Sequence, residues 1–189
     1  DWSSDVALPI CKGSLYQYFD NKTDLILGVC NKATALLTEE IKRVLIQDKL
    51  GIELVKMIGE TVMKFVNDHP EYFRAMRFHD YLRETKDIDD TTFLASCSNN
   101  MKESYTCMVR AIQIGMQDGS IESSYNPKEL AIVLWASSHG MVNMAYQHQN
   151  TQHFNLLHEL GVDMNSLFDN FMKIIGCGIA TDNFKNKKP

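Results

Sequence analysis

The stretch Cys11-Lys-Gly-Ser-Leu-Tyr-Gln-Tyr-Phe-Asp-Asn-Lys22 is the part of the sequence that decides how the rest is interpreted. Leu15 and Phe19 are four residues apart, so they share one helix face and can anchor this segment to an apolar core. Other groups in the segment suit a phosphate backbone and base edges: Lys12, Gly13, Ser14, Tyr16, Gln17, Tyr18 and Lys22. Asp20-Asn21 then ends the helix, and Asn21 or Thr23 can cap the next one.

This segment resembles the end of the helix-turn-helix in the TetR family of transcriptional regulators. The family pattern is approximately Gly-Val-Ser-Lys-Gly-Thr/Ser-Leu-Tyr-x-Tyr/His-Phe-x-x-Lys-x-x-Leu. Two positions depart from it: Pro9 stands where the turn glycine usually is, and Cys11 replaces the usual serine. An ordinary amphipathic turn at the start of a helical domain is the alternative interpretation. The matching residues are Lys12-Gly13-Ser14-Leu15-Tyr16, Tyr18-Phe19, Lys22 and Leu25.

The resemblance implies that the helix beginning near Cys11 enters the major groove of double-stranded operator DNA. Lys12 and Lys22 would then supply charge to phosphates, and each such contact adds to the salt dependence of binding. Gln17 suits an adenine edge, and Ser14 can also bond a base. The Gly13 amide can approach a phosphate closely. Tyr16 and Tyr18 can contact phosphates, sugars or thymine methyls, although core packing is an alternative for one of the two.

Composition indicates a helical chain without a membrane span. Hydrophobic residues make up 44% of the 189 residues, and only four prolines and ten glycines interrupt them. No apolar window of about eighteen residues is present, and we find no basic-then-apolar leader. The five cysteines are widely spaced and odd in number, which is typical of free thiols in a reducing compartment. We therefore expect a cytoplasmic protein.

The net charge of −5 argues against a protein that coats nucleic acid without specificity, but it permits a regulator with a local basic face. Residues 1–25 contain two lysines and four aspartates, so they offer few basic side chains for such a face. The chain begins at Asp1 without methionine. The resemblance implies roughly another helix and a half, often basic, before Cys11, and we expect that the N-terminus is either truncated or disordered.

Apolar residues recur with a helical period along most of the chain. The pattern predicts helices over 22–47, 51–67, 90–117 and 127–149, one opened by Pro70 and a last one starting at Asp163. Residues 150–162 are predicted to be a polar loop and 183–189 a frayed basic tail. No strand alternation appears, so the predicted fold is all-α. We expect an incomplete helix-turn-helix DNA-binding domain with its connecting helix over 1–46, and a ligand-binding and dimerisation domain over 47–189.

The larger domain is unusually rich in methionine and aromatic residues at helical spacing. Methionine adapts to varied shapes and suits promiscuous binding surfaces. Such a stripe also fits an ordinary core, and the family resemblance favours a pocket for a small-molecule effector. Glu60, Asp80 or Glu103 could pair with a cationic ligand, or could simply be solvated. The predicted ligand-binding residues are Met57, Phe65, Tyr72, Met76, Tyr81, Phe93, Met101, Tyr105, Met108 and Trp135.

The last two long helices can form a homodimer. Small side chains over 136–140 would let another helix approach closely. A two-fold dimer would place two reading helices about 34–36 Å apart, matching successive major grooves. The alternative is that these faces close the core of the monomer. The predicted interface residues are Ser137, Met141, Phe168, Phe171 and Ile175.

Other chemistries find little support in the sequence. We recognise no glycine-rich phosphate loop, nucleophile elbow or catalytic carboxylate pair, so we expect neither an enzyme nor a cofactor. His148, His153 and His158 are five apart, which does not align metal ligands on one helix face. The predicted function is a ligand-responsive transcriptional repressor that binds palindromic operator DNA as a dimer and is released by a small lipophilic effector. The alternative is a helical ligand- or partner-binding protein without DNA recognition.

Overall fold

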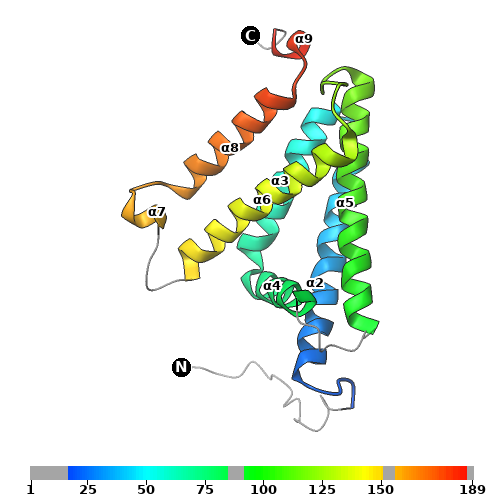
Figure 1. The fold of residues 1–189 in the computed structure, drawn as a ribbon, viewed down its shortest axis with the longest axis vertical. Helices are drawn as coiled ribbons and strands as arrows, with labels where there is room; N and C mark the ends of the chain where they lie inside the picture. The colour runs from blue at the N-terminus through cyan, green and yellow to red at the C-terminus, as the bar shows by residue number, and fades with distance from the viewer. Residues whose placement is uncertain (1–16, 85–91, 151–155, 187–189) are drawn as a thin grey trace, which may run out of the picture.

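A computed structural model describes residues 17–84, 92–150 and 156–186 of the chain. Helices account for nearly all of these residues, and their only β-type pairing is one isolated bridge between Ile121 and Ala180. The predicted all-α fold is therefore confirmed. The helices, labelled as in Figure 1, are α2 (Lys22–Leu45), α3 (Gly51–Asp68), α4 (Pro70–Glu84), α5 (Thr92–Asp118), α6 (Pro127–Asn150), α7 (Leu156–Glu159), α8 (Met164–Ile179) and α9 (Asp182–Lys185).

Helix α2 connects the exposed residues Gln17 and Tyr18, which precede it, to the body of the molecule. Its first turn is capped by Asn21, whose side-chain oxygen accepts a hydrogen bond from the Asp24 amide at 2.9 Å. Its buried stripe includes Leu27, Ala33 and Ile41 and faces α4 and α5, against which the helix packs (Figure 1). Helix α2 therefore joins the Tyr18–Lys22 segment to the core of the molecule.

Helix α3 begins without a side-chain cap of its own, because Leu50 carries no acceptor. The end of α5 supplies the missing acceptors. Asp118 Oδ2 accepts from the Gly51 amide at 2.7 Å, and Ser120 Oγ accepts from the Ile52 amide at 3.1 Å. These two contacts satisfy amides that a helix start otherwise leaves unpaired, and they fix α3 against α5.

The core lies between α2, α3, α5 and α6. Its largest fully buried apolar side chains include Phe65, Leu54 and Ile112, which belong to one continuous cluster. A smaller cluster around Phe73 and Val142 joins α3 and α4 to α6. The two clusters together hold these helices in one packed body.

Two short helices differ from the sequence prediction. Helix α7 lies inside the predicted loop 150–162, where buried Leu157 anchors it. Helix α9 lies in the predicted frayed tail, and Thr181 Oγ1 caps it by accepting from the Phe184 amide at 3.2 Å. Both are single turns whose stability comes from such local and tertiary contacts.

Helix α8 lies at the edge of the molecule, beside α6 and far from α5 along most of its length (Figure 1). Its C-terminal end is fixed to the loop that precedes α6. The Glu122 amide donates to the Ile179 carbonyl at 2.9 Å, and Thr181 Oγ1 donates to the Gly119 carbonyl at 2.7 Å. None of the helices in the described ranges is long and apolar enough to cross a membrane.

Candidate functional site

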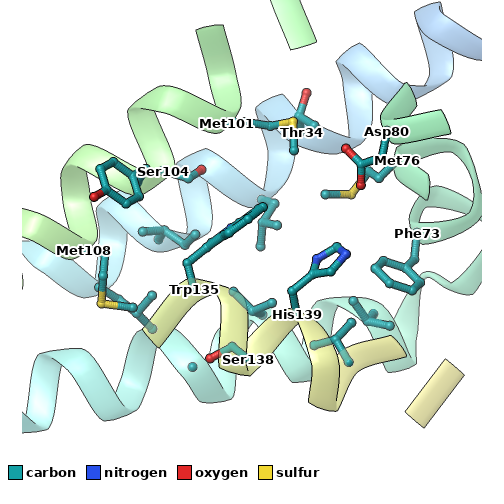
Figure 2. Close-up of a pocket in the computed structure, with 18 of the residues that line it drawn as sticks. Thr34, Phe73, Met76, Asp80, Met101, Ser104, Met108, Trp135, Ser138 and His139 are labelled. Atoms are coloured by element: carbon teal, nitrogen blue, oxygen red, sulfur yellow. The ribbon is translucent and has the colours of Figure 1, made fainter. Parts of the chain in front are cut away.

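A cavity of about 100 Å³ lies at the centre of the helical body (Figure 2). All the helices from α2 to α6 contribute to its wall. From α2 come Thr34, Leu37 and Ile41, on the same stripe that packs against the core. The helix that leads away from the Tyr18–Lys22 segment therefore also forms part of the cavity wall.

The wall is mainly apolar. Aliphatic side chains from α2 and α3, three methionines and aromatic rings form most of it. Neutral polar groups come from Thr34, Ser104, Tyr105 and Ser138. Such a surface, with a few polar groups set among apolar ones, is typical of small-molecule sites.

A carboxylate faces this apolar space. Figure 2 shows Asp80 beside Met76, across the cavity from the rings of Trp135 and His139. Asp80 Oδ1 lies 3.5 Å from Nδ1 of His79. The His79 ring is fully buried, and neither of its nitrogens has a hydrogen-bond partner among the residues that the structure describes. Of the two, only Asp80 lines the cavity, while His79 lies buried behind it without a hydrogen-bond partner in the described parts of the chain.

Arg77 also contributes to the wall, but its guanidinium is engaged elsewhere. Its central carbon lies 5.3 Å from the centroid of the Tyr146 ring, which is within the range of a cation–π contact. Tyr146 is not among the residues that line the cavity. The neighbouring Arg74 Nε donates to the Tyr146 hydroxyl at 3.2 Å. Both arginines are therefore held against α6.

Aromatic side chains from α6 form one side of the cavity. The rings of Trp135 and His139 are stacked, with centroids 5.3 Å apart, and the ring of Phe73 lies 6.4 Å from that of His139. Trp135 is 49% exposed although it lines the cavity. It thus stands between the interior and solvent.

A polar network joins α2 to α5 beside the cavity. Thr38 Oγ1 lies within hydrogen-bond distance of the Thr34 carbonyl (2.7 Å), the Asn100 carbonyl (3.1 Å) and Ser104 Oγ (2.8 Å). Asn100 Nδ2 reaches Asn31 Oδ1 at 3.0 Å and Thr34 Oγ1 at 3.1 Å. Because Thr34 and Ser104 also line the cavity, the network connects its wall to the α2–α5 interface.

Two thiols are buried further along α2 and α5. Cys30 and Cys97 are fully buried, and Cys97 Sγ lies 3.6 Å from the Leu27 carbonyl, to which it can donate. The hydrogen bond between the two thiols, together with burial, raises the pKa of Cys30. Cys30 is therefore a neutral, inert thiol at physiological pH.

The segment that resembles a DNA-reading helix is described only from Gln17 onward. Gln17, Tyr18 and Lys22 are exposed, with Tyr18 77% exposed. The Phe19 ring lies 5.9 Å from that of Phe93 and packs so closely on Gly28 that a Cβ there would be 2.6 Å from Phe19 Cε1. Phe19 thus fixes the turn to α2 and α5. The predicted contacts Lys12, Gly13, Ser14 and Tyr16 lie outside the described residues.

The structure brings together part of the predicted ligand-binding set. Met76, Met101, Tyr105, Met108 and Trp135 line the cavity. The others lie elsewhere: Phe65 is buried in the core, Met57 and Tyr72 pack against that core, Tyr81 is exposed, and Phe93 contacts Phe19. Thr34, Phe73, Ser104, Ser138 and His139 also line the cavity and were not predicted, and Asp80 was predicted only as one possible partner of a cationic ligand.

Three of the predicted dimer residues pack against the core of the monomer, and the other two make local contacts within α6 and α8. Met141 and Phe168 pack against the smaller core cluster, and Ile175 packs against the main one. Ser137 Oγ donates to the Val133 carbonyl at 2.8 Å, and the Phe171 ring lies 6.4 Å from that of Phe168. Large apolar side chains on the same two helices are exposed: Ile132, Val133 and Trp135 on α6, and Ile174 on α8, which is 70% exposed.

A second hollow, of about 310 Å³, lies between α3 and α8 and is more open than the central cavity. Ile52, Val55 and Met172 are on its apolar side, and Lys56 and Lys173 also line it. We take the central cavity as the candidate site because five helices enclose it, including the one that leads to the Tyr18–Lys22 segment. In the described parts of the chain, no group of three His, Cys, Asp or Glu side chains is placed to hold a metal ion.

Comparison with known proteins gives a shared fold. No protein-family model matches the chain, and no curated protein matches its sequence. A protein of unknown function from Rhodococcus sp. RHA1 has a similar structure, with a TM-score of 0.68 and 14% identity over 89% of this chain and 80% of that one. So does a Clostridium perfringens protein provisionally described as a fatty acid metabolism regulator, with a TM-score of 0.64 and 17% identity over 91% of this chain and 84% of that one. Identities this low establish the architecture alone.

Proposed function

We propose that this protein is a ligand-responsive transcriptional regulator of the TetR type. In this proposal it is a repressor that binds palindromic operator DNA as a dimer and is released by a small, mostly apolar effector. One observation carries the proposal: α2 begins at Lys22, beside the exposed segment that resembles a DNA-reading helix, and also forms part of the cavity wall. The description of the Clostridium perfringens protein as a regulator of metabolism supports it.

The coupling between the two sites would run through α2. A ligand that displaces Thr34 or Leu37 acts on a helix whose first turn adjoins Tyr18 and Lys22. A coupling free energy of about 1–3 kcal/mol, which is typical of such switches, would change the affinity for the operator about 5- to 150-fold. Because α2 packs along α4 and α5, it would move together with them.

The dimer would use α6 and α8. Their exposed apolar side chains, including Val133 and Ile174, would be buried by a second copy. Several exposed apolar side chains on neighbouring helices can mark an interaction site. Two copies are also what a palindromic operator requires, because each reading helix contacts only a few base pairs.

The direct test is selection of bound sequences by the full-length protein from a random DNA library, followed by titration of the selected site at several salt concentrations. We expect a palindromic site. Replacing Lys22 by Ala should weaken binding and make the slope of log affinity against log salt shallower by about one for each phosphate that the lysine neutralises. Lys49→Ala, at an exposed lysine in the α2–α3 connection, is the matched control and should leave both unchanged.

Acidic residues near the segment that resembles a DNA-reading helix favour an alternative function without DNA recognition. Asp20 and Asp24 lie close in sequence to Lys22, so the described part of this segment is not basic. A helical ligand-binding protein that does not recognise DNA would have this property. If the selection enriches no sequence although the protein is folded and binds a small molecule, the regulator proposal fails and this alternative replaces it.

A further inference from the structure

We infer that the central cavity binds a compact organic cation with an apolar shell, such as an alkylated ammonium ion, and that Asp80 is the counter-ion. The inference rests on the proposed function only for the role of effector. It depends on the charge balance of the cavity wall and on the chemistry of its apolar surface.

Among the described residues, Asp80 is the only acidic one that lines the cavity. No lysine or arginine in the described ranges forms an ion pair with it, and the ionisable nitrogen nearest to it among those pairs is Nδ1 of the buried His79, at 3.5 Å. The Asp80 side chain is 36% exposed and otherwise lies beside apolar side chains, where attraction to a bound cation is stronger than in bulk water. Asp80 therefore favours a positive ligand.

The basic residue in the wall does not cancel this preference. Arg77 is exposed, and its guanidinium lies over the Tyr146 ring at 5.3 Å. A cation–π contact holds it to a ring outside the cavity. An anionic ligand would have to draw Arg77 away from Tyr146 and would also lie near the Asp80 carboxylate.

The rest of the wall suits the shell of such a cation. Trp135, Phe73 and Tyr105 present aromatic surface, which attracts alkylated ammonium groups through the ring quadrupole. Met76 lies beside Asp80 and adds an adaptable thioether (Figure 2). The volume of about 100 Å³ limits the ligand to a compact one, and Trp135, which is 49% exposed, leaves the cavity open enough for part of the ligand to reach solvent.

Three probes of nearly equal shape test the charge preference: choline, its neutral analogue 3,3-dimethylbutan-1-ol and the anion 3,3-dimethylbutanoate. The chain has two tryptophans, so Trp2→Phe leaves Trp135 as the only tryptophan reporter of cavity binding. Titrations run at constant ionic strength into the tens of millimolar. We expect saturable quenching by choline at an affinity at least about tenfold above that of either analogue.

Variants assign the preference to one residue. Asp80→Asn should remove it, and Asp80→Glu, which restores the charge, should recover part of it. Arg77→Gln should leave or increase choline affinity, since it removes a like charge. Asp48→Asn, at an exposed aspartate between α2 and α3, is the matched control for loss of one negative charge and should change nothing. Circular dichroism confirms that each variant is folded.

Clear outcomes overturn the inference: no saturable binding of choline, equal or tighter binding of an analogue, or an unchanged preference in folded Asp80→Asn. Binding of 3,3-dimethylbutanoate that Arg77→Gln abolishes would assign the cavity to anions instead. None of these measurements involves DNA. A cation site could therefore stand although the regulator proposal fails, and operator binding could stand although choline does not bind.

Discussion

At the scale of single residues, the polar network between α2 and α5 is the feature where one substitution should lower stability most clearly. Asn100 Nδ2 reaches Asn31 and Thr34, and the Asn100 carbonyl is within reach of Thr38 Oγ1. Thr34 is buried, so its hydroxyl oxygen cannot turn to water, whereas the Asn100 carbonyl near Thr38 is a backbone group that a side-chain substitution leaves in place. Loss of the Asn100 side chain leaves acceptors unpaired.

We predict that Asn100→Ala lowers the free energy of unfolding by about 2 kcal/mol, since buried acceptors without partners typically cost about 1–3 kcal/mol. Urea denaturation monitored by circular dichroism measures the change. The adjacent Asn99 is exposed, so Asn99→Ala should alter stability by less than about 0.5 kcal/mol. Equal effects of the two substitutions would show that the network contributes nothing specific.

The sequence predicts individual cavity residues unevenly. Met76, Met101, Met108 and Trp135 stood out by residue type, and all of them line the cavity. Phe65 stood out for the same reason but is buried in the core, because apolar spacing reveals a buried face without showing whether a neighbour fills the space beside it. Polar members such as Thr34 and His139 could not be found by that pattern.

At the scale of helices, the crossing of α3 and α5 is set by two glycines. A Cβ added at Gly51 would lie 2.0 Å from the Gly115 amide nitrogen and 2.7 Å from the Ala111 carbonyl oxygen. These are backbone atoms of a packed helix, so they cannot move aside cheaply. The same crossing carries the Asp118 and Ser120 caps of α3.

We predict that Gly51→Ala destabilises the protein by about 3 kcal/mol, near the upper end of typical overpacking costs. Thermal unfolding measures it as a lower midpoint. Gly176→Ala, inside α8, is the matched control because a Cβ there would meet nothing within 4 Å. Alanine is the better helix former, so this control should be neutral or stabilising by up to about 1 kcal/mol. A neutral Gly51→Ala would contradict the close crossing.

The long helices could be predicted closely, and the short ones could not. The predicted limits 51–67 and 127–149 differ by one residue at one end from Gly51–Asp68 and Pro127–Asn150, because long periodic stretches with Pro and cap signals carry strong local information. Helix α7 is a single turn that depends on burial of Leu157. No periodicity develops over four residues, so sequence reasoning had no signal for it.

At the scale of the whole molecule, the exposed apolar side chains of α6 and α8 bear on assembly. Ile174 on α8 is 70% exposed, and Ile46 between α2 and α3 is 85% exposed. The two have the same chemistry, but only Ile174 lies on the proposed interface. They form a matched pair for a test of the dimer.

We predict that Ile174→Glu weakens self-association at least about tenfold, because it buries a charge at the interface. Analytical ultracentrifugation over a range of protein concentrations measures it. Ile46→Glu should sediment like the unchanged protein. A monomeric unchanged protein, or equal behaviour of the two variants, would exclude α6 and α8 as the dimer interface.

The bridge between Ile121 and Ala180 has a mechanical consequence for such an assembly. It pins one end of α8, whose 16 residues extend about 24 Å from that point. A helix fastened in this way acts as a lever arm. By simple geometry, a tilt of about 10° at the pinned end displaces the far end by about 4 Å, so a slight readjustment around Ala180 would become a larger change in the spacing of two subunits.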